Sequence, residues 1–127
     1  MAVLLSSITN ILLSFMQRVL AKIVQEFPRD QYWLLREESA KFIGVLIAIF
    51  RPKVFLEIGT GVGYSGIYLA ENLAKFGGRL LTVESHAERF AIAKQHFAEA
   101  GLTETITQVA GHAPEVFPQI TGNFDMC

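Results

Sequence analysis

The sequence predicts an α/β protein whose parallel sheet is doubly wound, with helices on both of its faces. From residue 53 onward, short apolar runs typical of buried strands alternate with longer segments typical of helices. The first of these runs leads directly into a loop with three glycines at alternate positions, as occurs where a strand of such a sheet meets a ligand. We therefore expect a helical segment over residues 1–52 and a partial α/β domain over residues 53–127.

The N-terminal segment predicts a long amphipathic helix that ends before Pro28. Its apolar residues recur in steps of three and four, which places them in one stripe of a helix. The stripe consists of Leu4, Ile8, Ile11, Leu12, Phe15, Val19 and Ile23. We expect this stripe to be buried against the domain or a partner subunit. Polar residues interrupt the apolar run and no basic residue precedes it, so it predicts neither a signal peptide nor a membrane span.

A second helix is expected from Glu37 to Phe50, because Pro52 disfavours helix in the residue before it. This helix is rich in apolar side chains, which predicts that it packs under the sheet. They are Phe42, Ile43, Val45, Leu46, Ile49 and Phe50.

The remaining residues predict strands and helices in alternation. The expected order is strand 54–58, helix 64–76, strand 79–84, helix 86–100, strand 105–109, a short helix 114–120 and the start of a further strand at 124–127. Gly77, Gly78 and Gly101 follow the two longer helices, where glycine readily ends a helix. Ser85, followed three residues later by Glu88, predicts a capping box at the start of the second of them.

The glycine loop after the first strand allows two interpretations. Residues 61–66 form a G-x-G-x-x-G, and Glu84 follows Gly66 by 18 residues, close to the spacing of a dinucleotide-binding fingerprint. Shifted upstream, the same segment is an acidic residue followed by alternating glycines, from Glu57 to Gly63. The second frame explains more residues. In both, glycines let a ligand approach the backbone, and the following helix offers free N–H groups.

Four segments in this order resemble the successive motifs of class I S-adenosylmethionine-dependent O-methyltransferases of the catechol and caffeoyl-CoA type. They are residues 56–65 (LEIGTGVGYS), 82–84 (TVE), 109–113 (VAGHA) and 124–125 (FD). The resemblance covers residues 39–127 and implies the N-terminal half of a Rossmann-like methyltransferase sheet, with strands in the order 3-2-1 and the start of strand 4. It assigns Asp125 a structural role at the start of that strand.

The resemblance also implies a role for each part of the site. Glu57 would lie near the methionine end of the cofactor, with the glycine loop passing under it, and Ser65 would bond to the methionine carboxylate. Glu84 would accept hydrogen bonds from the ribose hydroxyls, and the turn after the third strand would face the adenine. The full set of expected cofactor-binding residues is Glu57, Gly59, Thr60, Gly61, Gly63, Ser65, Glu84, Gly111, His112 and Ala113.

Simpler interpretations of these residues remain open. Glu57 could be an ordinary carboxylate at a strand end, Glu84 could be solvated, and His112 could belong to a loop without chemistry. His96 has no partner at metal-ligand spacing, so we expect no zinc there. We assign no catalytic or metal-binding residue, because the family's metal site begins after the fourth strand, beyond Cys127. A divalent metal is therefore expected only in a full-length enzyme.

Composition narrows the class of protein. The net charge of −1 gives no electrostatic basis for nucleic-acid binding, and the single cysteine fits a reducing, cytoplasmic setting. Hydrophobic residues make up 51% of the 127, more than half a sheet readily buries, so we expect a homo-oligomer or a completing chain.

Three functions remain open on the sequence. The first is the S-adenosylmethionine-binding part of an O-methyltransferase that acts on a small-molecule hydroxyl, with the catalytic half beyond this sequence. The second is a fragment of an NAD(P)-binding Rossmann oxidoreductase. The third is a non-catalytic cofactor-binding subunit that a partner chain completes.

Overall fold

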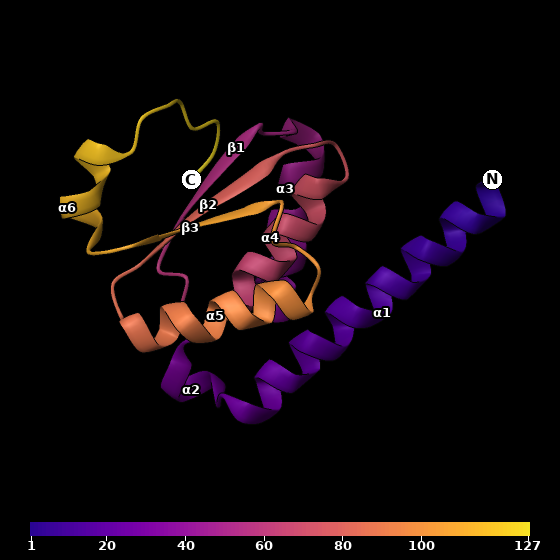
Figure 1. Cartoon of the computed structure of the whole chain (residues 1–127), viewed down its shortest axis with the longest axis horizontal. Coiled ribbons are helices and arrows are strands. Elements are labelled where there is room, and N and C mark those ends of the chain that lie inside the picture. The colour runs from indigo at the N-terminus through magenta and orange to yellow at the C-terminus, as the bar shows by residue number, and fades with distance from the viewer.

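The computed structural model describes the backbone of residues 1–127, and the side chains of all residues except 2, 5, 6 and 8–14. Three parallel strands form a sheet in the order β1-β2-β3, and Figure 1 shows them side by side. The strands are β1 Val54–Ile58, β2 Arg79–Glu84 and β3 Ile106–Ala110. This order and direction confirm the predicted half of a doubly wound sheet.

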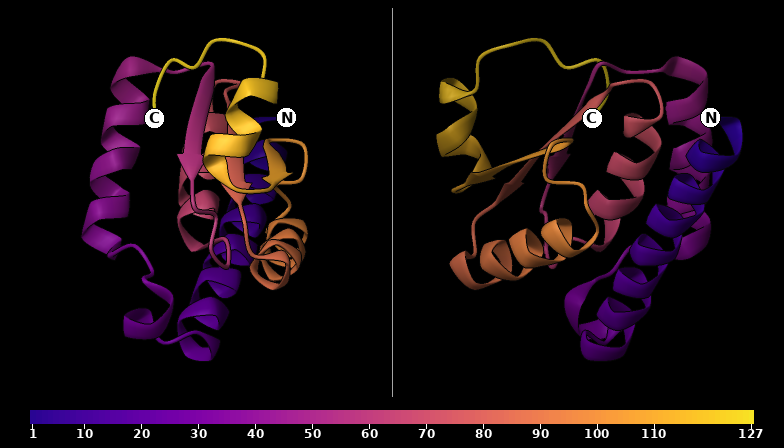
Figure 2. Two further views of the ribbon diagram at one scale, coloured as in Figure 1. Left: turned by 90° about the vertical axis from the view of Figure 1, so that its left-hand side faces the viewer. Right: turned by 45° about the vertical axis from the view of Figure 1, so that its right-hand side comes forward.

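Except for the short helix α2, which was not predicted, the helices lie close to their predicted positions. They are α1 Ala2–Glu26, α2 Arg29–Tyr32, α3 Glu37–Phe50, α4 Tyr64–Ala74, α5 Ala87–Glu99, α6 Ala113–Val116 and the 3-10 turn η1 Phe117–Gln119. Figures 1 and 2 show α4 and α5 on one side of the sheet and α6 on the other. The two connections α4 and α5 make the parallel pairing of successive strands possible.

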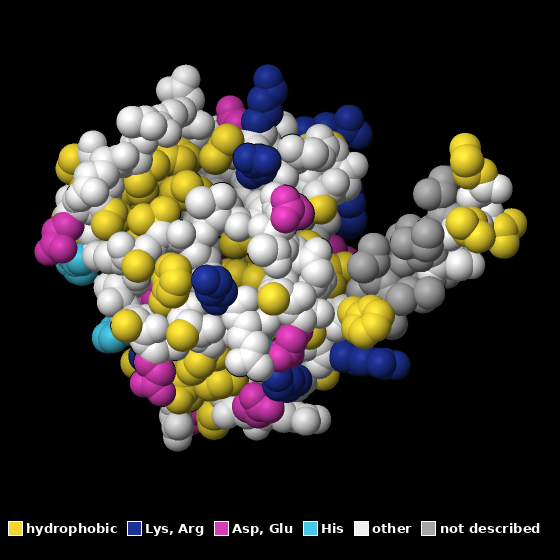
Figure 3. All heavy atoms as spheres, viewed as in Figure 1, with side chains coloured by type: hydrophobic (Ala, Val, Ile, Leu, Met, Phe, Trp, Pro, Cys, Tyr) yellow, Lys and Arg dark blue, Asp and Glu magenta, His cyan; other side chains and the backbone are white. Residues whose placement is uncertain are grey.

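Side chains along each strand alternate between these two faces of the sheet. Phe55, Leu80 and Ile106 face the main core, which α1, α3, α4 and α5 complete. Leu56 and Val83 face the other way and pack against Val116 of α6. This second face is only partly covered, and hydrophobic side chains remain visible beside α6 (Figure 3).

Among the described residues of the stripe predicted for helix α1, Val19 and Ile23 are buried, whereas Leu4 is 70% and Phe15 47% exposed. Met16 and Leu20, which were not assigned to the stripe, are buried beside them. Ile8, Ile11 and Leu12 lie outside the described side chains. The first turns of α1 extend away from the domain in Figure 1. Near its other end, Lys22 forms an ion pair with Glu99 of α5 at 3.0 Å.

Within the described part of the chain, no helix is both long and apolar enough to cross a membrane.

Helix α3 does not pack in the way that its apolar residues predicted. Its buried residues are Ala40, Gly44 and Ile47, which face α4, while Phe42, Val45, Ile49 and Phe50 are exposed. The reason is close packing: a Cβ added at Gly44 would lie 3.0 Å from the side chain of Asn72. The contact face of α3 therefore combines two small residues with Ile47, while Phe42, Val45, Ile49 and Phe50 point elsewhere.

The capping box predicted at Ser85 is wrong. Helix α5 begins one residue later, with His86 at the N-cap position and no side-chain cap. Glu84 accepts the N–H of the N-cap residue His86 through its Oε1 at 2.8 Å, the bond that Glu88 would make in a capping box.

The C-terminal residues begin a strand beside β1, as predicted. Met126 forms a parallel bridge with Phe55, and its carbonyl accepts the N–H of Leu56 at 2.9 Å. Asp125 has the structural role expected of it, since its Oδ2 accepts the N–H groups of Lys53 and Val54 at 2.8 and 3.0 Å.

Candidate cofactor-binding site

The carboxyl ends of the three strands bring the predicted motifs to one edge of the sheet. A cavity of about 160 Å³ lies there. It is lined by Ile58, Gly59, Val83, Glu84, Ser85, Gly111, His112 and Ala113. Ligands of open α/β sheets bind at this edge. The structure therefore brings together the glycine loop, the second-strand acid and the third-strand turn.

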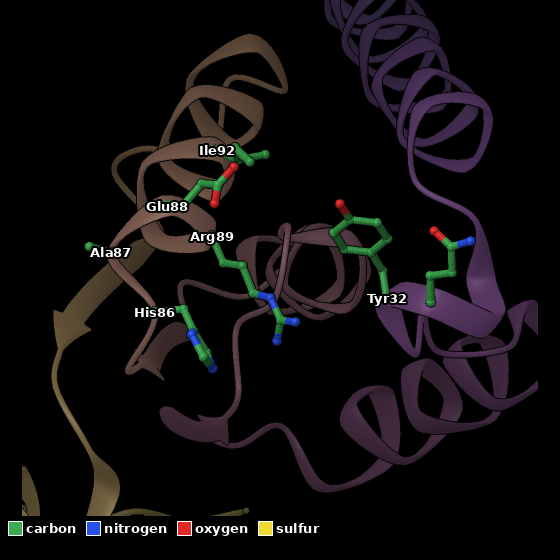
Figure 4. Close-up of a pocket in the computed structure, with 7 residues that line it drawn as sticks. Tyr32, His86, Ala87, Glu88, Arg89 and Ile92 are labelled. Atoms are coloured by element: carbon green, nitrogen blue, oxygen red, sulfur yellow. The ribbon is translucent and has the colours of Figure 1, made fainter.

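Three further cavities adjoin this edge. One of about 170 Å³ separates the glycine loop from residues 32–35, and it also touches Glu84 and Arg89. A second, of about 600 Å³, lies beside β1 and α3 and reaches Glu57, Gly59 and Ser65. Figure 4 shows the third, of about 590 Å³, where Tyr32 of α2 faces His86 and Arg89 at the start of α5. The first two of these cavities border the glycine loop directly.

The three loop glycines have different tasks. Gly59, Gly61 and Gly63 have φ values of 89°, 56° and 92°, which glycine adopts most readily. A Cβ added at Gly59 or Gly61 would meet nothing within 4 Å, whereas one at Gly63 would lie 3.0 Å from the ring of Phe97. The first two glycines therefore leave their backbone open to a ligand, and the third permits close packing on α5.

The loop is held from beneath by β2 and α5. Gly59 and Thr60 both donate their N–H to the carbonyl of Val83, at 2.9 and 3.1 Å. His96 lies buried with its Nδ1 2.7 Å from the carbonyl of Val62. Because a carbonyl only accepts, Nδ1 carries the proton in this bond. The sequence did not reveal this anchor, although the helical spacing of His96 from Ala93 and Ala100 places it on the buried face.

Glu57 is enclosed among hydroxyl groups. Ser65 donates to its Oε1 at 2.5 Å, and Thr82 donates to its Oε2 at 2.7 Å. Burial raises the pKa of Glu57 to about 7, while the bonds from Ser65 and Thr82 act in the opposite direction. The carboxyl group is therefore poised between its neutral and charged forms near neutral pH. The bond predicted from Ser65 to a ligand carboxylate would require that hydroxyl to leave Glu57.

Glu84 is a buried carboxylate that binds backbone, so the interpretation of a merely solvated residue is wrong. Glu84 is only 5% exposed. Oε2 accepts the N–H of Gly61, and Oε1 accepts the N–H of His86, both at 2.8 Å. Each carboxylate oxygen can accept a further bond, so ligand hydroxyls could bind without breaking these contacts.

The turn after β3 depends on Gly111. Its φ is 141°, and an added Cβ would lie 2.4 Å from Cγ1 of Val116. Its N–H donates to the carbonyl of Glu84 at 2.9 Å, which ties this turn to the end of β2. His112 is exposed and occupies the N-cap position of α6 without a side-chain cap, while Ala113 packs beside Val116. The packing of Gly111 and Ala113 thus determines where His112 lies, but it places no requirement on the His112 side chain.

These groups fit a cofactor with a cationic end and a hydroxylated sugar. Glu57 lies beside the open backbone of Gly59, Glu84 lies under Gly61, and the turn at Gly111 borders the same cavity as Glu84. Among the side chains that the structure describes, no group of three or more His, Cys, Asp or Glu residues is arranged to hold a metal ion.

Comparisons with known sequences agree with the motifs. A family model described as O-methyltransferase matches residues 8–126. The catechol O-methyltransferase of Niastella koreensis is 38% identical over 92 residues, covering 69% of this chain and 41% of that protein. The catechol O-methyltransferase of Sus scrofa is 33% identical over 89 residues, covering 70% of this chain and 47% of that protein. The chain thus spans somewhat less than half the length of these relatives.

Solved structures show the same likeness and do not favour the dinucleotide alternative. The O-methyltransferase TomG from Streptomyces achromogenes, in complex with SAM, matches with a TM-score of 0.75 and 31% identity, over 85% of this chain and 51% of that chain. The O-methyltransferase from Bacillus cereus, in complex with SAH, matches with a TM-score of 0.74 and 27% identity, over 86% and 52%. With a family match across nearly all of its residues, the chain belongs to the family of S-adenosylmethionine-dependent O-methyltransferases.

Proposed function

We propose that this chain binds S-adenosylmethionine at the carboxyl edge of its sheet, for methyl transfer to the hydroxyl of a small molecule. The observation that carries the proposal is the pair of carboxylates, Glu57 and Glu84, at the ends of neighbouring strands with the open glycine loop between them. The SAM and SAH complexes of related O-methyltransferases support this choice of ligand.

Each residue has a proposed task in binding. Glu57 holds the cationic amino group of the cofactor, and Ser65 turns from Glu57 toward its carboxylate. Glu84 accepts bonds from the ribose hydroxyls while it keeps Gly61 in place. Gly111, His112 and Ala113 border the adenine, mainly through their backbone. Gly59, Thr60, Gly61 and Gly63 form the floor of the site.

When bound, S-adenosylmethionine supplies an electrophilic sulfonium methyl group that an acceptor oxygen can attack in line. The contribution of this chain is to bind and orient that group, since a correctly placed reactant removes much of the entropic barrier. The wide cavity beside β1 has an apolar lining and reaches Glu57 and Ser65, so we place the acceptor on that side. We also propose that methyl transfer by the full-length enzyme depends on a divalent metal and that the protein is located in the cytoplasm.

The test is calorimetric binding of S-adenosylhomocysteine to the purified chain and to Glu84→Ala. We expect the wild type to bind, and the substitution to weaken binding by about 1.5–3 kcal/mol, the range for hydrogen bonds to charged groups. Glu104→Ala, which removes an exposed carboxylate from the loop before β3, is the matched control and should bind as the wild type does. Binding of NADH in place of S-adenosylhomocysteine would contradict the proposal, and an unchanged affinity of Glu84→Ala would remove the ribose assignment.

A further inference from the structure

Two threonines, one from the glycine loop and one from β2, form a buried hydrogen-bonded chain with Glu57. Thr82 is 0% exposed and Thr60 is 2% exposed. Their hydroxyl oxygens lie 2.6 Å apart, and the hydroxyl of Thr82 also lies 2.7 Å from Oε2 of Glu57. Ser65 approaches the other carboxylate oxygen from α4. The carboxyl group of Glu57 is therefore the end point of a chain of hydroxyls that begins at the glycine loop.

The direction of each proton follows from counting donors. A threonine hydroxyl has one proton, and Thr82 gives its proton to Glu57. The bond between the threonines must then be donated by Thr60. Ser65 also donates to Glu57, so two hydroxyls donate to the carboxylate directly, and Thr60 donates to one of them. This arrangement favours the ionised form of Glu57 over the neutral form.

The register of the sheet explains why residue 82 can do this. Glu57 and Thr82 are paired residues of β1 and β2, so their side chains stand next to each other on the face covered by α4. Valine would have nearly the shape of threonine there but would leave Oε2 of Glu57 without its donor. The other groups around this carboxyl are Ser65 and Gly66 of α4, which carry no charge, and Glu84 of β2, whose negative charge disfavours ionisation.

We propose that Thr82 is a positioning residue for cofactor binding, which together with Thr60 holds Glu57 as an ionised acceptor aimed at the cationic amino group of the ligand. This inference rests on the proposed function. Without the hydroxyl of Thr82, Glu57 should take up a proton at higher pH, because a bond to its charged form is lost. Binding of a cationic group should then require a more alkaline solution.

The experiment is a calorimetric measurement of S-adenosylhomocysteine affinity from pH 6 to 8.5 for the wild type, Thr82→Val and Thr82→Ser. We expect the midpoint of the pH profile of Thr82→Val to move up by about one unit, which makes binding about fivefold weaker near pH 7, about tenfold weaker near pH 6 and nearly normal near pH 8.5. Thr82→Ser keeps the hydroxyl and should follow the wild type. Comparing variants at equal pH removes the titration of the ligand itself.

Two further variants make the result specific. Thr107→Val places the same substitution on β3, at an exposed position, and should leave the profile unchanged. Thr60→Val should shift the midpoint in the same direction as Thr82→Val but less, because Thr60 acts on Glu57 through Thr82. An identical profile for Thr82→Val and the wild type would overturn the proposal. So would an equal loss in Thr82→Val and Thr82→Ser at every pH, since that indicates damage to packing.

A second readout needs no ligand. Carbon NMR of the Glu57 carboxyl gives its pKa directly, and we expect a higher pKa in Thr82→Val than in the wild type or Thr82→Ser. If the wild type fails to bind S-adenosylhomocysteine, the proposed function fails, whereas the NMR titration still tests the link between Thr82 and Glu57. An unshifted pKa in folded Thr82→Val would refute the positioning role.

Discussion

At the scale of single residues, Glu57 and Glu84 show how neighbouring carboxylates obtain different properties. Both stand on the face of the sheet that α4 and α5 cover, at the ends of paired strands. Glu84 is bonded by two backbone N–H groups, and so is tied to the loop and to the start of α5. Glu57 is bonded by side-chain hydroxyls, and burial raises its pKa. Glu84 therefore has a fixed structural task, whereas the charge of Glu57 can respond to pH and to a ligand.

The raised pKa of Glu57 predicts how the stability of the ligand-free chain depends on pH. The pKa rises from 4.5 to about 7 on folding, so the folded state binds the proton more tightly than the unfolded state does. The resulting stabilisation is complete below about pH 4.5 and is lost as the pH rises through about 7. One pKa unit corresponds to 1.36 kcal/mol, so the ionisation of Glu57 should lower the free energy of unfolding by up to about 3 kcal/mol as the pH rises through these limits.

Urea unfolding at pH 5 and pH 8 measures this effect. Glu57→Gln cannot ionise, so we expect it to lose less stability than the wild type when the pH is raised. Glu88→Gln, at an exposed position of α5, is the control and should behave as the wild type does. Equal pH dependence of Glu57→Gln and the wild type would show that Glu57 is ionised with an ordinary pKa in the folded chain.

The roles that the sequence could not identify depend on contacts between distant segments. The acid and glycines of residues 57–63 are adjacent in the chain, so their pattern was readable, and the structure places them at the predicted edge. Thr82 matters because its strand pairs in register with β1, and His96 matters because its helix passes under Val62. Neither relation leaves a local pattern in the sequence.

At the scale of elements, strands and helix ends were predictable because local chemistry determines them. Apolar runs set the strands, and Pro28, Pro52 and the glycines set the ends of helices. The orientation of α3 was not predictable, since apolar residues lie on more than one side of it and the small residues Ala40 and Gly44 form the contact. The start of α5 differed because the carboxylate of Glu84 on the preceding strand binds the N–H of His86, the bond expected of Glu88.

The turn between β3 and α6 gives a prediction for an element. Gly111→Ala should move α6 away from the cavity, because the new Cβ would overlap Cγ1 of Val116 at 2.4 Å. We expect a loss of roughly 1–3 kcal/mol in the free energy of unfolding, the range for a strained backbone position, and weaker S-adenosylhomocysteine binding. Thermal unfolding and calorimetry measure the two effects.

The matched control is Gly122→Ala. Gly122 also has a positive φ, 129°, but nothing lies within 4 Å of an added Cβ. It should therefore show the backbone cost alone, without an effect on binding. If Gly111→Ala and Gly122→Ala lower the free energy of unfolding equally, and neither weakens S-adenosylhomocysteine binding, then contact with Val116 does not hold this side of the site in place.

At the scale of the whole molecule, apolar surface remains uncovered along α3. The exposed side of α3 carries Phe42 at 64% and Ile49 at 67% exposure, with Val45 and Phe50 beside them. The apolar cavity next to β1 adjoins this helix through Ile43 and Leu46. Continuous exposed apolar surface of this kind is typical of sites of association. It supports the proposal that a second copy or a completing chain covers this side of the domain.

This surface predicts that the purified chain associates with itself. We expect light scattering after size-exclusion chromatography to give a mass above 14.1 kDa that increases with protein concentration. Phe42→Lys combined with Ile49→Lys should shift the chain toward the monomer without loss of stability, because both side chains are already exposed. Phe117→Lys, at an exposed apolar position of η1, should leave the mass unchanged. A chain that is monomeric at all concentrations, or association that the α3 substitutions do not weaken, would exclude this face as the site of self-association.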